Sequence, residues 1–471
     1  MATWVDRRGF LKAAAAGAAC GPAACAGPGG APPSRPDVYR QPAMDVPVAE
    51  EADVVVCGAG PAGVAAAIAA ARAGAKTRLL EVNGCLGGVW TAGLLCWILD
   101  SRPKGGLMKE IADELVRRGE GFRPREGRED ALGYDVEIMK LLLEEMCGRA
   151  GVRVRLHTRV TAAPRAGKDR VAYAVTESKS GREAWAGKVF VDATGDGDLA
   201  AQAGCGFDVG QEGTGQVQPL SLIAILAGAK ADEIAPFVRS LAEPRGEPNP
   251  KRRLLEEFKR AGVEPSYHAP TIFPLPGGLF CMMANHEYGV RADDASGISE
   301  ATLRARAEVH RLVDALRKLG GIWKDFRIVV TAEHIGVREG RRVRGLATVT
   351  EADLAAGARH EDAVCRVHFP VDVHSTDPKA TKGIMGQKVR ARPYDVPLRA
   401  LIAKDADNLL MAGRCISGDF IAHSSYRVTG NSVPMGEAAG VAAALAAARG
   451  KPPREIPWAD VRNELEKTGV K

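Results

Sequence analysis

The feature that most constrains the fold is a strand, a glycine-rich turn and a helix near residue 60. The valine-rich run 54–57 reads as a buried parallel strand, and it leads into Gly58-Ala59-Gly60-Pro61-Ala62-Gly63 and an alanine-rich stretch. Gly58 allows a tight turn, Gly60 lets the backbone approach a pyrophosphate, and Gly63 lets the helix pack closely. Pro61 and Ala62 open the helix, whose N-terminal N–H groups favour phosphates.

A second apolar run, Thr77 to Leu80, ends at Glu81. An acid at this distance from the glycine-rich turn accepts hydrogen bonds from a ribose. Strand, turn, helix, strand and acid occur together, so the pattern predicts a dinucleotide-binding unit.

Three later segments resemble the flavoproteins that have two dinucleotide-binding domains. Gly87 and Gly88 follow Glu81, where that superfamily packs a loop along FAD. Residues 189–200 resemble its Ala-Thr-Gly turn, and residues 408–440 resemble its second FAD fingerprint. The resemblance implies FAD as the cofactor and adds the following cofactor-binding residues: Gly195, Asp196, Gly413, Arg414, Gly436 and, through its backbone at the adenine, Val160.

Residues 335–354 are similar to the Gly-Val-Arg-Glu-Ser-Arg-Arg signature of the bacterial FAD-dependent oxidoreductase family. The resemblance runs from about residue 52 to about residue 448. The chain departs from the family at Gly340, where the family usually has serine, and along 418–427, where only Arg427 and Val428 look usual. Because of these departures, the resemblance does not identify the substrate.

The predicted fold class is α/β: a Rossmann-like FAD-binding domain with a mostly parallel sheet and an inserted β-meander, plus an α+β substrate-side domain. The meander is expected from strands at 152–160, 170–178 and 183–192. The predicted parts are a signal peptide (1–26), a linker (27–51), the first part of the FAD-binding domain (52–213), the substrate-side domain (214–394), the C-terminal part of the FAD-binding domain (395–449) and a tail (450–471).

Three helices are expected from end signals and periodicity. One runs from an Asp135 N-cap to Arg149, and one runs from a Ser299 N-cap to Leu319 with its leucines in the core. The third runs from Met435 to Ala448, with its N-terminus toward the flavin pyrimidine ring.

The first 26 residues are typical of a twin-arginine export signal. Arg7 and Arg8 precede a weakly apolar alanine stretch, and Ala24-Cys25-Ala26 is a small-residue cleavage site. This pattern predicts export of the folded holoprotein to the periplasm by the twin-arginine machinery. Cys20 and Cys25 leave a lipoprotein anchor as the less favoured alternative.

Charge and cysteines exclude several classes of protein. A net charge of +6 is too small to indicate nucleic-acid binding. The cysteines after Cys25 form no Cys-x-x-Cys pair, so neither a metal site nor a flavin disulfide reductase is expected. No second GxGxxG pattern occurs, which favours direct contact between a small substrate and the flavin.

The expected catalytic residues lie before the C-terminal helix and in the family signature. His423, in a loop, is the expected proton acceptor, and Arg427 and Arg338 are expected to bind a substrate carboxylate. The alternative for the arginines is an internal ion pair with Glu339 or Glu437. Further pocket candidates are Asn285, His286 and His374, and the two histidines are the next choice for the base.

Together these features predict an exported FAD-dependent oxidoreductase, a dehydrogenase or oxidase that passes a hydride from a small metabolite to flavin N5. The electron acceptor is left open among oxygen, a quinone and a redox protein. Two alternatives stay open: a flavin-dependent reductase of an activated double bond, and a non-catalytic FAD-binding maturation or scaffold protein.

Overall fold

The computed structural model describes residues 39, 41–101, 104–123, 131–239 and 249–468. The chain divides after Asp45, and the helices and strands named below belong to the unit Val46–Lys471. The predicted export signal, with Cys20 and Cys25, lies outside the described residues. Within the ranges given above, no helix combines the length and apolar character needed to cross a bilayer.

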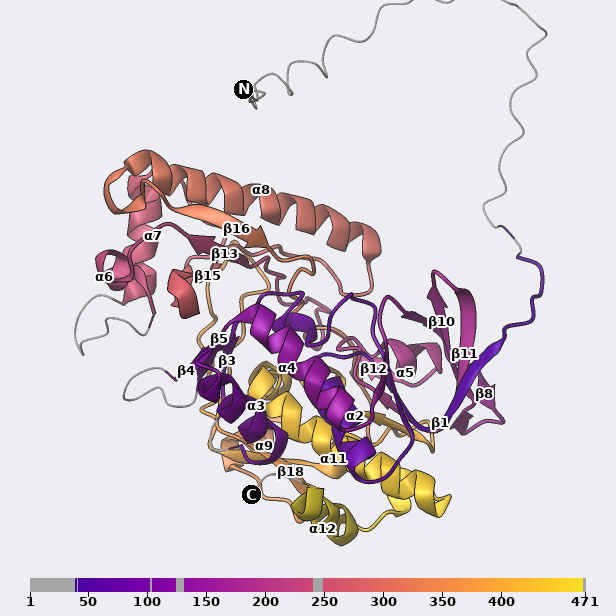
Figure 1. Cartoon of the computed structure of the whole chain (residues 1–471). Coiled ribbons are helices and arrows are strands. Elements are labelled where there is room, and N and C mark those ends of the chain that lie inside the picture. The colour runs from indigo at the N-terminus through magenta and orange to yellow at the C-terminus, as the bar shows by residue number, and fades with distance from the viewer. Residues whose placement is uncertain (1–38, 40, 102–103, 124–130, 240–248, 469–471) are drawn as a thin grey trace, which may run out of the picture. The chain divides into compact units, whose positions relative to one another are not determined.

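A parallel sheet carries the predicted nucleotide-binding unit (Figure 1). β1 (Val48–Cys57) lies between β2 (Thr77–Leu80) and β11 (Gly181–Asp192), β6 (Arg153–Arg155) pairs with β2, and β20 (Leu409–Met411) pairs with the end of β11. All of these pairings are parallel, which confirms the predicted α/β fold with a mostly parallel Rossmann-like sheet.

β1 begins earlier than the end of the predicted linker. Val48 lies opposite Ala184, and the carbonyl of Pro47 accepts a hydrogen bond from the Ala184 N–H at 2.9 Å. Pairing with β11 therefore makes residues 48–51 part of the sheet.

The meander is built on the first half of β11. β10 (Tyr173–Ser178) runs antiparallel to β11, and β7 (Arg159–Ala162) runs antiparallel to β10. The single strand predicted at 152–160 is wrong, because β6 and β7 are separate strands. His157 between them has φ 51°, a left-handed conformation that interrupts a strand.

Helices α2 (Pro61–Arg72) and α11 (Thr429–Arg449) pack backbone against backbone. A Cβ on Gly436 would lie 2.1 Å from the Ala62 carbonyl oxygen, and one on Gly440 would lie 2.1 Å from that of Ala66. The contact therefore depends on glycine, and it joins the first glycine-rich loop to the C-terminal part of the chain.

α11 begins at Thr429, so the predicted start at Met435 is wrong. Pro434 lies inside the helix, where it cannot donate to the carbonyl of Gly430. The first turn is held by packing, because the Gly430 N–H donates to the Leu99 carbonyl at 3.2 Å and a Cβ there would lie 2.4 Å from the same oxygen. Tertiary contact thus outweighs the local preference to start a helix at proline.

A second layered region, at the top of Figure 1, combines an antiparallel sheet with α7 (Pro250–Arg260) and α8 (Ala295–Leu319). Its sheet order is β14 (Thr271–Pro274), β15 (Phe280–Met283), β13 (Ala224–Ala227), β16 (Arg327–Thr331). Between sheet and helices lies a separate apolar cluster that includes Leu254, Phe258, Leu312, Leu316 and Trp323.

α4 (Val136–Arg149) and α8 test the predicted helix starts. Asp135 accepts a hydrogen bond from the Ile138 N–H at 3.0 Å, which confirms the first N-cap. The second prediction is wrong: Asp294 is the N-cap of α8, and Ser299 lies inside the helix with its hydroxyl donating to the Ala295 carbonyl at 2.7 Å. The leucine stripe of α8 is in the core, as predicted.

The remaining strands and α-helices of the described chain are mostly short. They are β3 (Trp97–Ile98), β4 (Gly121–Phe122), β5 (Leu132–Tyr134), β8 (Arg165–Ala166), β9 (Arg170–Val171), β12 (Phe207–Asp208), β17 (Arg342–Val343), β18 (Ala363–Val367), β19 (Tyr394–Pro397), α3 (Gly106–Arg117), α5 (Asp198–Gln202), α6 (Ala231–Ile234), α9 (Glu351–Ala356), α10 (Phe420–Tyr426) and α12 (Trp458–Thr468).

Every cysteine in the described residues is a free thiol, and all except the partly exposed Cys85 are buried. The buried ones pack as small apolar core residues.

Glu437 of α11 caps the start of α3. Its Oε1 accepts a hydrogen bond from the Leu107 N–H at 2.9 Å, and its side chain is buried. Burial raises the pKa of Glu437 from 4.5 to about 7, although the Leu107 N–H and the charge of Arg72 oppose the shift. The unfolded chain loses this proton at lower pH than the folded protein does, so the free energy of unfolding falls as pH rises from about 4.5 to about 7.

Glu437→Gln keeps an acceptor for α3 and removes the ionisation. We expect the variant to gain about 2–3 kcal/mol relative to the natural chain between pH 5 and pH 8. Urea unfolding at both pH values measures the difference, with exposed Glu137→Gln on α4 as the control that should not change. An equal difference at both pH values would contradict the assignment.

Candidate functional site

The first glycine-rich loop joins β1 to α2 and leaves open space at its centre. Gly58 has φ 91°, and a Cβ there would lie 2.4 Å from the Ala193 carbonyl oxygen. A Cβ on Gly63 would lie 1.8 Å from the Gly58 carbonyl oxygen. Gly60 differs, because its φ is −66° and no heavy atom lies within 4 Å of its Cβ position. This opening at the N-terminus of α2 fits a diphosphate that approaches the backbone.

The second glycine pair lies on the first loop. The Gly87 N–H donates to the Ala59 carbonyl at 2.8 Å, and a Cβ on Gly88 would lie 2.9 Å from the Cα of Gly60. The two loops that the family resemblance assigns to FAD therefore meet at Gly60.

Glu81 lies beneath these loops. Its carboxylate accepts hydrogen bonds from the Ala59 N–H at 2.5 Å and the Asn83 N–H at 2.8 Å. Burial raises the pKa of Glu81, while these hydrogen bonds lower it. The Asn83 side-chain amide also donates to Oε1 at 2.7 Å, so Oε2, which accepts only from Ala59 among the described residues, is the oxygen that keeps a lone pair for a ribose hydroxyl.

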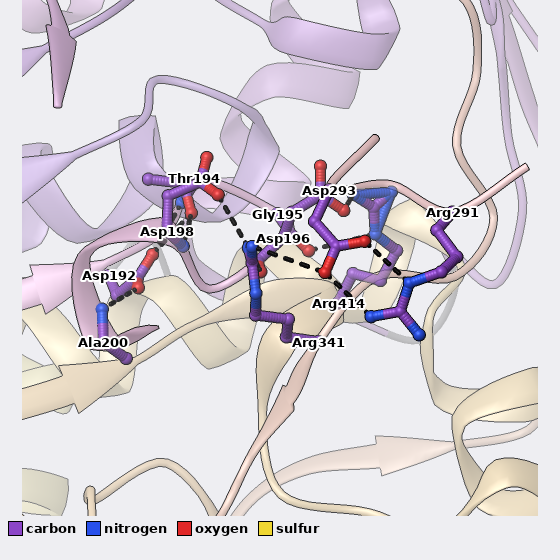
Figure 2. A network of polar contacts seen from close by, with 10 residues as sticks. All are labelled: Asp192, Thr194, Gly195, Asp196, Asp198, Ala200, Arg291, Asp293, Arg341 and Arg414. Atoms are coloured by element: carbon purple, nitrogen blue, oxygen red, sulfur yellow. Dashed lines mark hydrogen bonds and ion pairs between the residues drawn. The ribbon is translucent and has the colours of Figure 1, made fainter. Parts of the chain in front are cut away.

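The turn after β11 is organised by the buried Asp192 (Figure 2). Its Oδ1 accepts from the Thr194 hydroxyl at 2.7 Å, and its Oδ2 accepts from the Ala200 N–H at 2.8 Å. Burial raises the pKa of Asp192 to about 6, although the hydrogen bonds oppose the shift. The turn so fixed holds Gly195 at φ 83°.

Arg414 clamps this turn to the family signature (Figure 2). Its guanidinium donates to the Gly195 carbonyl at 3.1 Å, to the Asp196 carboxylate and to the Val337 carbonyl. Arg341 adds hydrogen bonds to the Asp196 carbonyl at 3.0 Å and the Asp198 carboxylate at 2.9 Å. The described contacts of Arg414 are thus to protein groups, and its contact with FAD stays a prediction.

The clamp also explains the departure at Gly340. A Cβ there would lie 2.0 Å from Oδ1 of Asp196. Serine, usual in the family, would displace the Asp196 carboxylate from Arg414.

Three predicted cofactor residues lie at packing positions. Gly436 meets Ala62 in the helix contact described above, and a Cβ on Gly413 would lie 3.0 Å from the Cβ of Ala62. Val160 lies in β7 opposite Thr176. Binding of FAD by these residues stays a prediction.

Arg338 and Arg427, both partly buried, lie side by side next to the clamp. Arg427 donates to the Arg338 carbonyl at 3.1 Å and to the Asp372 carbonyl at 2.8 Å. Arg338 donates to the Pro219 carbonyl at 2.6 Å and to the Ser221 hydroxyl at 2.9 Å. Since Val337 accepts from Arg414, the pair directly adjoins the predicted FAD turn.

Within the described part of the chain, neither arginine of this pair makes an ion pair. Glu339 instead pairs with Arg342 at 2.5 Å, and Glu437 caps α3, so the alternative of an internal ion pair is wrong. Burial lowers the pKa of Arg338 and lowers that of Arg427 to about 10, so both stay charged at neutral pH. Asp372 is the carboxylate whose charge acts on both, which leaves an excess positive charge.

His423 lies in α10, so the predicted loop is wrong. Asp419 caps this helix, since its carboxylate accepts from the Ala422 N–H at 2.7 Å, and that N-cap could have been recognised in the sequence. The ring of His423 is fully buried, and neither ring nitrogen has a hydrogen-bond partner among the described residues. Burial lowers its pKa well below the ordinary value, as do the charges of nearby arginines. Its role as proton acceptor stays a prediction.

His286 and His374 are brought together. Nε2 of His286 lies 2.9 Å from Nδ1 of His374. Gln218 links the histidine pair to the arginines. Its Oε1 accepts from the backbone N–H of His374 at 2.9 Å and from the Arg427 guanidinium at 3.1 Å. Asn285, by contrast, makes two hydrogen bonds with the backbone of Leu222 and acts in packing.

Sequence reasoning missed Gln218, Asp372, Tyr267 and Tyr288, which complete this cluster. They lie far apart in the chain, and no spacing or motif marks them. Among the described residues, no group of three or more His, Cys, Asp or Glu side chains is placed to hold a metal ion.

The model of the family described as FAD dependent oxidoreductase matches residues 53–465. Comparison with the curated proteins finds no match.

Among solved structures, the chain is similar to a geranylgeranyl bacteriochlorophyll reductase-like protein from Thermoplasma acidophilum, with 13% identity and a TM-score of 0.42 over 89% of this chain and 82% of that one. It is also similar to p-nitrophenol 4-monooxygenase from Pseudomonas putida, with 11% identity and a TM-score of 0.44 over 91% and 85%. A flavin-dependent brominase shows 11% identity and a TM-score of 0.46 over 88% and 84%.

The open position at Gly60 gives a direct test of cofactor binding. A Cβ at residue 60 has open space around it and needs no unusual φ, so we expect Gly60→Val to give a folded protein whose FAD content falls roughly tenfold or more, because the side chain takes the space of the diphosphate. Flavin absorbance after heat release and the unfolding temperature of the apoprotein measure the two effects. Gly58→Ala is the contrast, since it collides with Ala193 and should lower stability itself. Full FAD content in Gly60→Val would place the diphosphate elsewhere.

Proposed function

Because this chain belongs to the FAD dependent oxidoreductase family, we propose that it is an exported dehydrogenase or oxidase that passes a hydride from a small acidic metabolite to the flavin. The reduced flavin then passes its electrons to oxygen, a quinone or a redox protein.

The observation that carries this proposal is the pair Arg338 and Arg427. Both guanidinium groups are partly buried, and the groups to which they donate in the described residues are neutral. The charge of Asp372 acts on both arginines, and that of Glu339, which is already paired with Arg342, acts on Arg427. Arg338 uses three of its N–H groups, one of them on the weak acceptor Sδ of Met283. The remaining donors suit a carboxylate, which would also neutralise the excess charge.

Bound FAD supplies the acceptor for the hydride. The two glycine loops and Glu81 would hold its diphosphate and ribose, and the arginine pair would orient the acid beside it. The proton from the substrate's O–H or N–H needs an acceptor on the protein. The candidates are His423, as predicted from the sequence, and the hydrogen-bonded pair His286 and His374.

Anaerobic reduction of the purified holoprotein tests the proposal. We expect one or more small acids to bleach the flavin, and NADH and NADPH to do so only slowly. Arg338→Gln and Arg427→Gln should raise the half-saturating acid concentration by about 10- to 100-fold, the scale of a lost charged hydrogen bond. If His423 is the base, His423→Ala should slow bleaching by roughly 10²-fold.

Each outcome separates the alternatives. Reoxidation by readmitted air marks an oxidase, and reoxidation only by a quinone or redox protein marks a dehydrogenase. Oxidation of the pre-reduced flavin by an acid with an activated double bond, with no bleaching by any acid, would support the reductase instead. Inertness in both directions would favour the scaffold protein.

The proposed export rests on the sequence of residues 1–26. Arg7→Lys together with Arg8→Lys should leave folded, flavin-loaded protein in the cytoplasm, because the export machinery reads the arginine pair. Cell fractionation with flavin fluorescence measures the distribution. Export of the double variant at the natural level would refute the signal.

A further inference from the structure

We propose that a hydrogen-bond chain of fixed direction runs through four side chains: Asp372, His374, His286 and Tyr288. In this direction the Tyr288 hydroxyl can only accept a hydrogen bond from the substrate, so the site takes a small acid bearing a hydroxyl or amino group. This inference rests on the proposed function and names its substrate class.

The four side chains form a continuous series of short contacts. Oδ2 of Asp372 lies 3.3 Å from Nε2 of His374. Nδ1 of His374 lies 2.9 Å from Nε2 of His286, and Nδ1 of His286 lies 3.1 Å from the Tyr288 hydroxyl oxygen. Both histidines are buried and Asp372 and Tyr288 are partly exposed, so the two ends of the series are the parts that reach solvent.

The charge of Asp372 sets the direction of the series. Although burial opposes ionisation, the contact with His374 and the charges of Arg427 and Arg338 hold the pKa of Asp372 well below its ordinary value. An ionised carboxylate can only accept, so the proton of His374 lies on Nε2. Burial lowers the pKa of His374 to about 3, so the ring carries no second proton at neutral pH, and its Nδ1 must accept.

The position of the proton on His374 in turn fixes the position of the proton on His286. Burial also lowers the pKa of His286, so this ring has a single proton. Since Nδ1 of His374 accepts, that proton lies on Nε2 of His286, and Nδ1 of His286 must accept from Tyr288. The opposite arrangement would turn a lone pair of His374 toward the Asp372 carboxylate, which is repulsive.

Packing holds the rings in this arrangement. The ring of Tyr267 lies 4.1 Å from that of His286, centroid to centroid. The backbone N–H of His286 donates to the Ser266 hydroxyl at 2.8 Å, and that hydroxyl donates to the Glu308 carboxylate of α8 at 2.7 Å. At the other end, Gln218 joins His374 to Arg427, as described above, so the chain and the arginine pair form one unit.

The direction of the chain determines which hydrogen bonds the Tyr288 hydroxyl can offer a ligand. Burial raises the pKa of Tyr288 to about 12 even though the charge of Arg338 lowers it, so the phenol keeps its proton at neutral pH. That proton is donated to His286; the Ser266 carbonyl, at 3.4 Å, is the more distant acceptor. Only lone pairs of the hydroxyl remain for a ligand. An acid held by Arg338 therefore gains a hydrogen bond if it carries O–H or N–H, and gains none if that position is a methylene.

The first test compares matched acids on the holoprotein with its flavin reduced by dithionite, so that binding occurs without turnover. Calorimetric titration uses the pairs lactate and propionate, malate and succinate, and alanine and propionate. We expect at least one hydroxy or amino acid to bind about tenfold or more tightly than its partner, the scale set by an unpaired buried polar group. Tyr288→Phe should remove the preference while the affinity for the deoxy acid stays within about threefold. Tyr173→Phe, on β10, is the matched control that should keep the preference.

The outcomes separate the two proposals. Deoxy acids that bind through Arg338 with no preference for their hydroxy partners would overturn the fixed chain and leave the acid site standing. Absence of binding by every acid in the panel would overturn both.

The second test reads the tautomers directly and needs no ligand. In holoprotein labelled with 15N-histidine, His286 and His374 should both show protonated Nε2 and unprotonated Nδ1 from pH 6 to pH 8, with His286→Gln and His374→Gln used to assign the signals. Asp372→Asn should weaken this bias, and Asp372→Glu should restore it. A protonated Nδ1 on either ring of the natural chain would overturn the proposed direction.

Discussion

The close contact of α2 and α11 is the constraint on which the site depends. At Gly436 and Gly440 the backbone of one helix touches carbonyl oxygens of the other, and no side chain could be inserted without moving the helices apart. Ala62, where the contact begins, belongs to the first turn after the glycine-rich loop, and Gly413 touches the same residue. One small surface therefore aligns the first nucleotide-binding loop with the returning C-terminal segment.

From that alignment the polar clamp follows. Gly413 places Arg414 next to the turn after β11, where it contacts the Gly195 carbonyl and Asp196 (Figure 2). The same guanidinium also donates to the Val337 carbonyl. Val337 precedes Arg338, so the segment that is joined to the predicted FAD turn also carries the first arginine of the proposed acid site. Gly340 belongs to the same arrangement, because its missing side chain is the space that Asp196 occupies. At Gly340 the side chain usual in the family is thus replaced by the partly buried carboxylate of Asp196.

The parts of the fold that sequence reasoning predicted are those with strong local signals. The strand ending at Leu80, the N-cap at Asp135 and the turn at Gly58 each follow from a few neighbouring residues. The starts of α8 and α11 were predicted wrongly, because Asp294 competes with Ser299 as a cap and because packing on Leu99 outweighs the effect of Pro434. Within the candidate site, the arginines were found through the family resemblance. Tyr288, Asp372 and Gln218 could not be found, since only tertiary contact brings them to the histidines.

The order of the central sheet has a consequence for how the protein is made. β20 completes the sheet beside β11, and α11 closes it against α2, yet both are contributed by residues after 408. A ribosome therefore has to synthesise nearly the whole chain before the first glycine loop acquires its final neighbours. While the chain is still being synthesised, the FAD site lacks β20 and α11. FAD binding is therefore expected to follow the synthesis of these elements. A chain that stops before α11 lacks the helix that packs on the first glycine loop, so truncation there should prevent flavin binding.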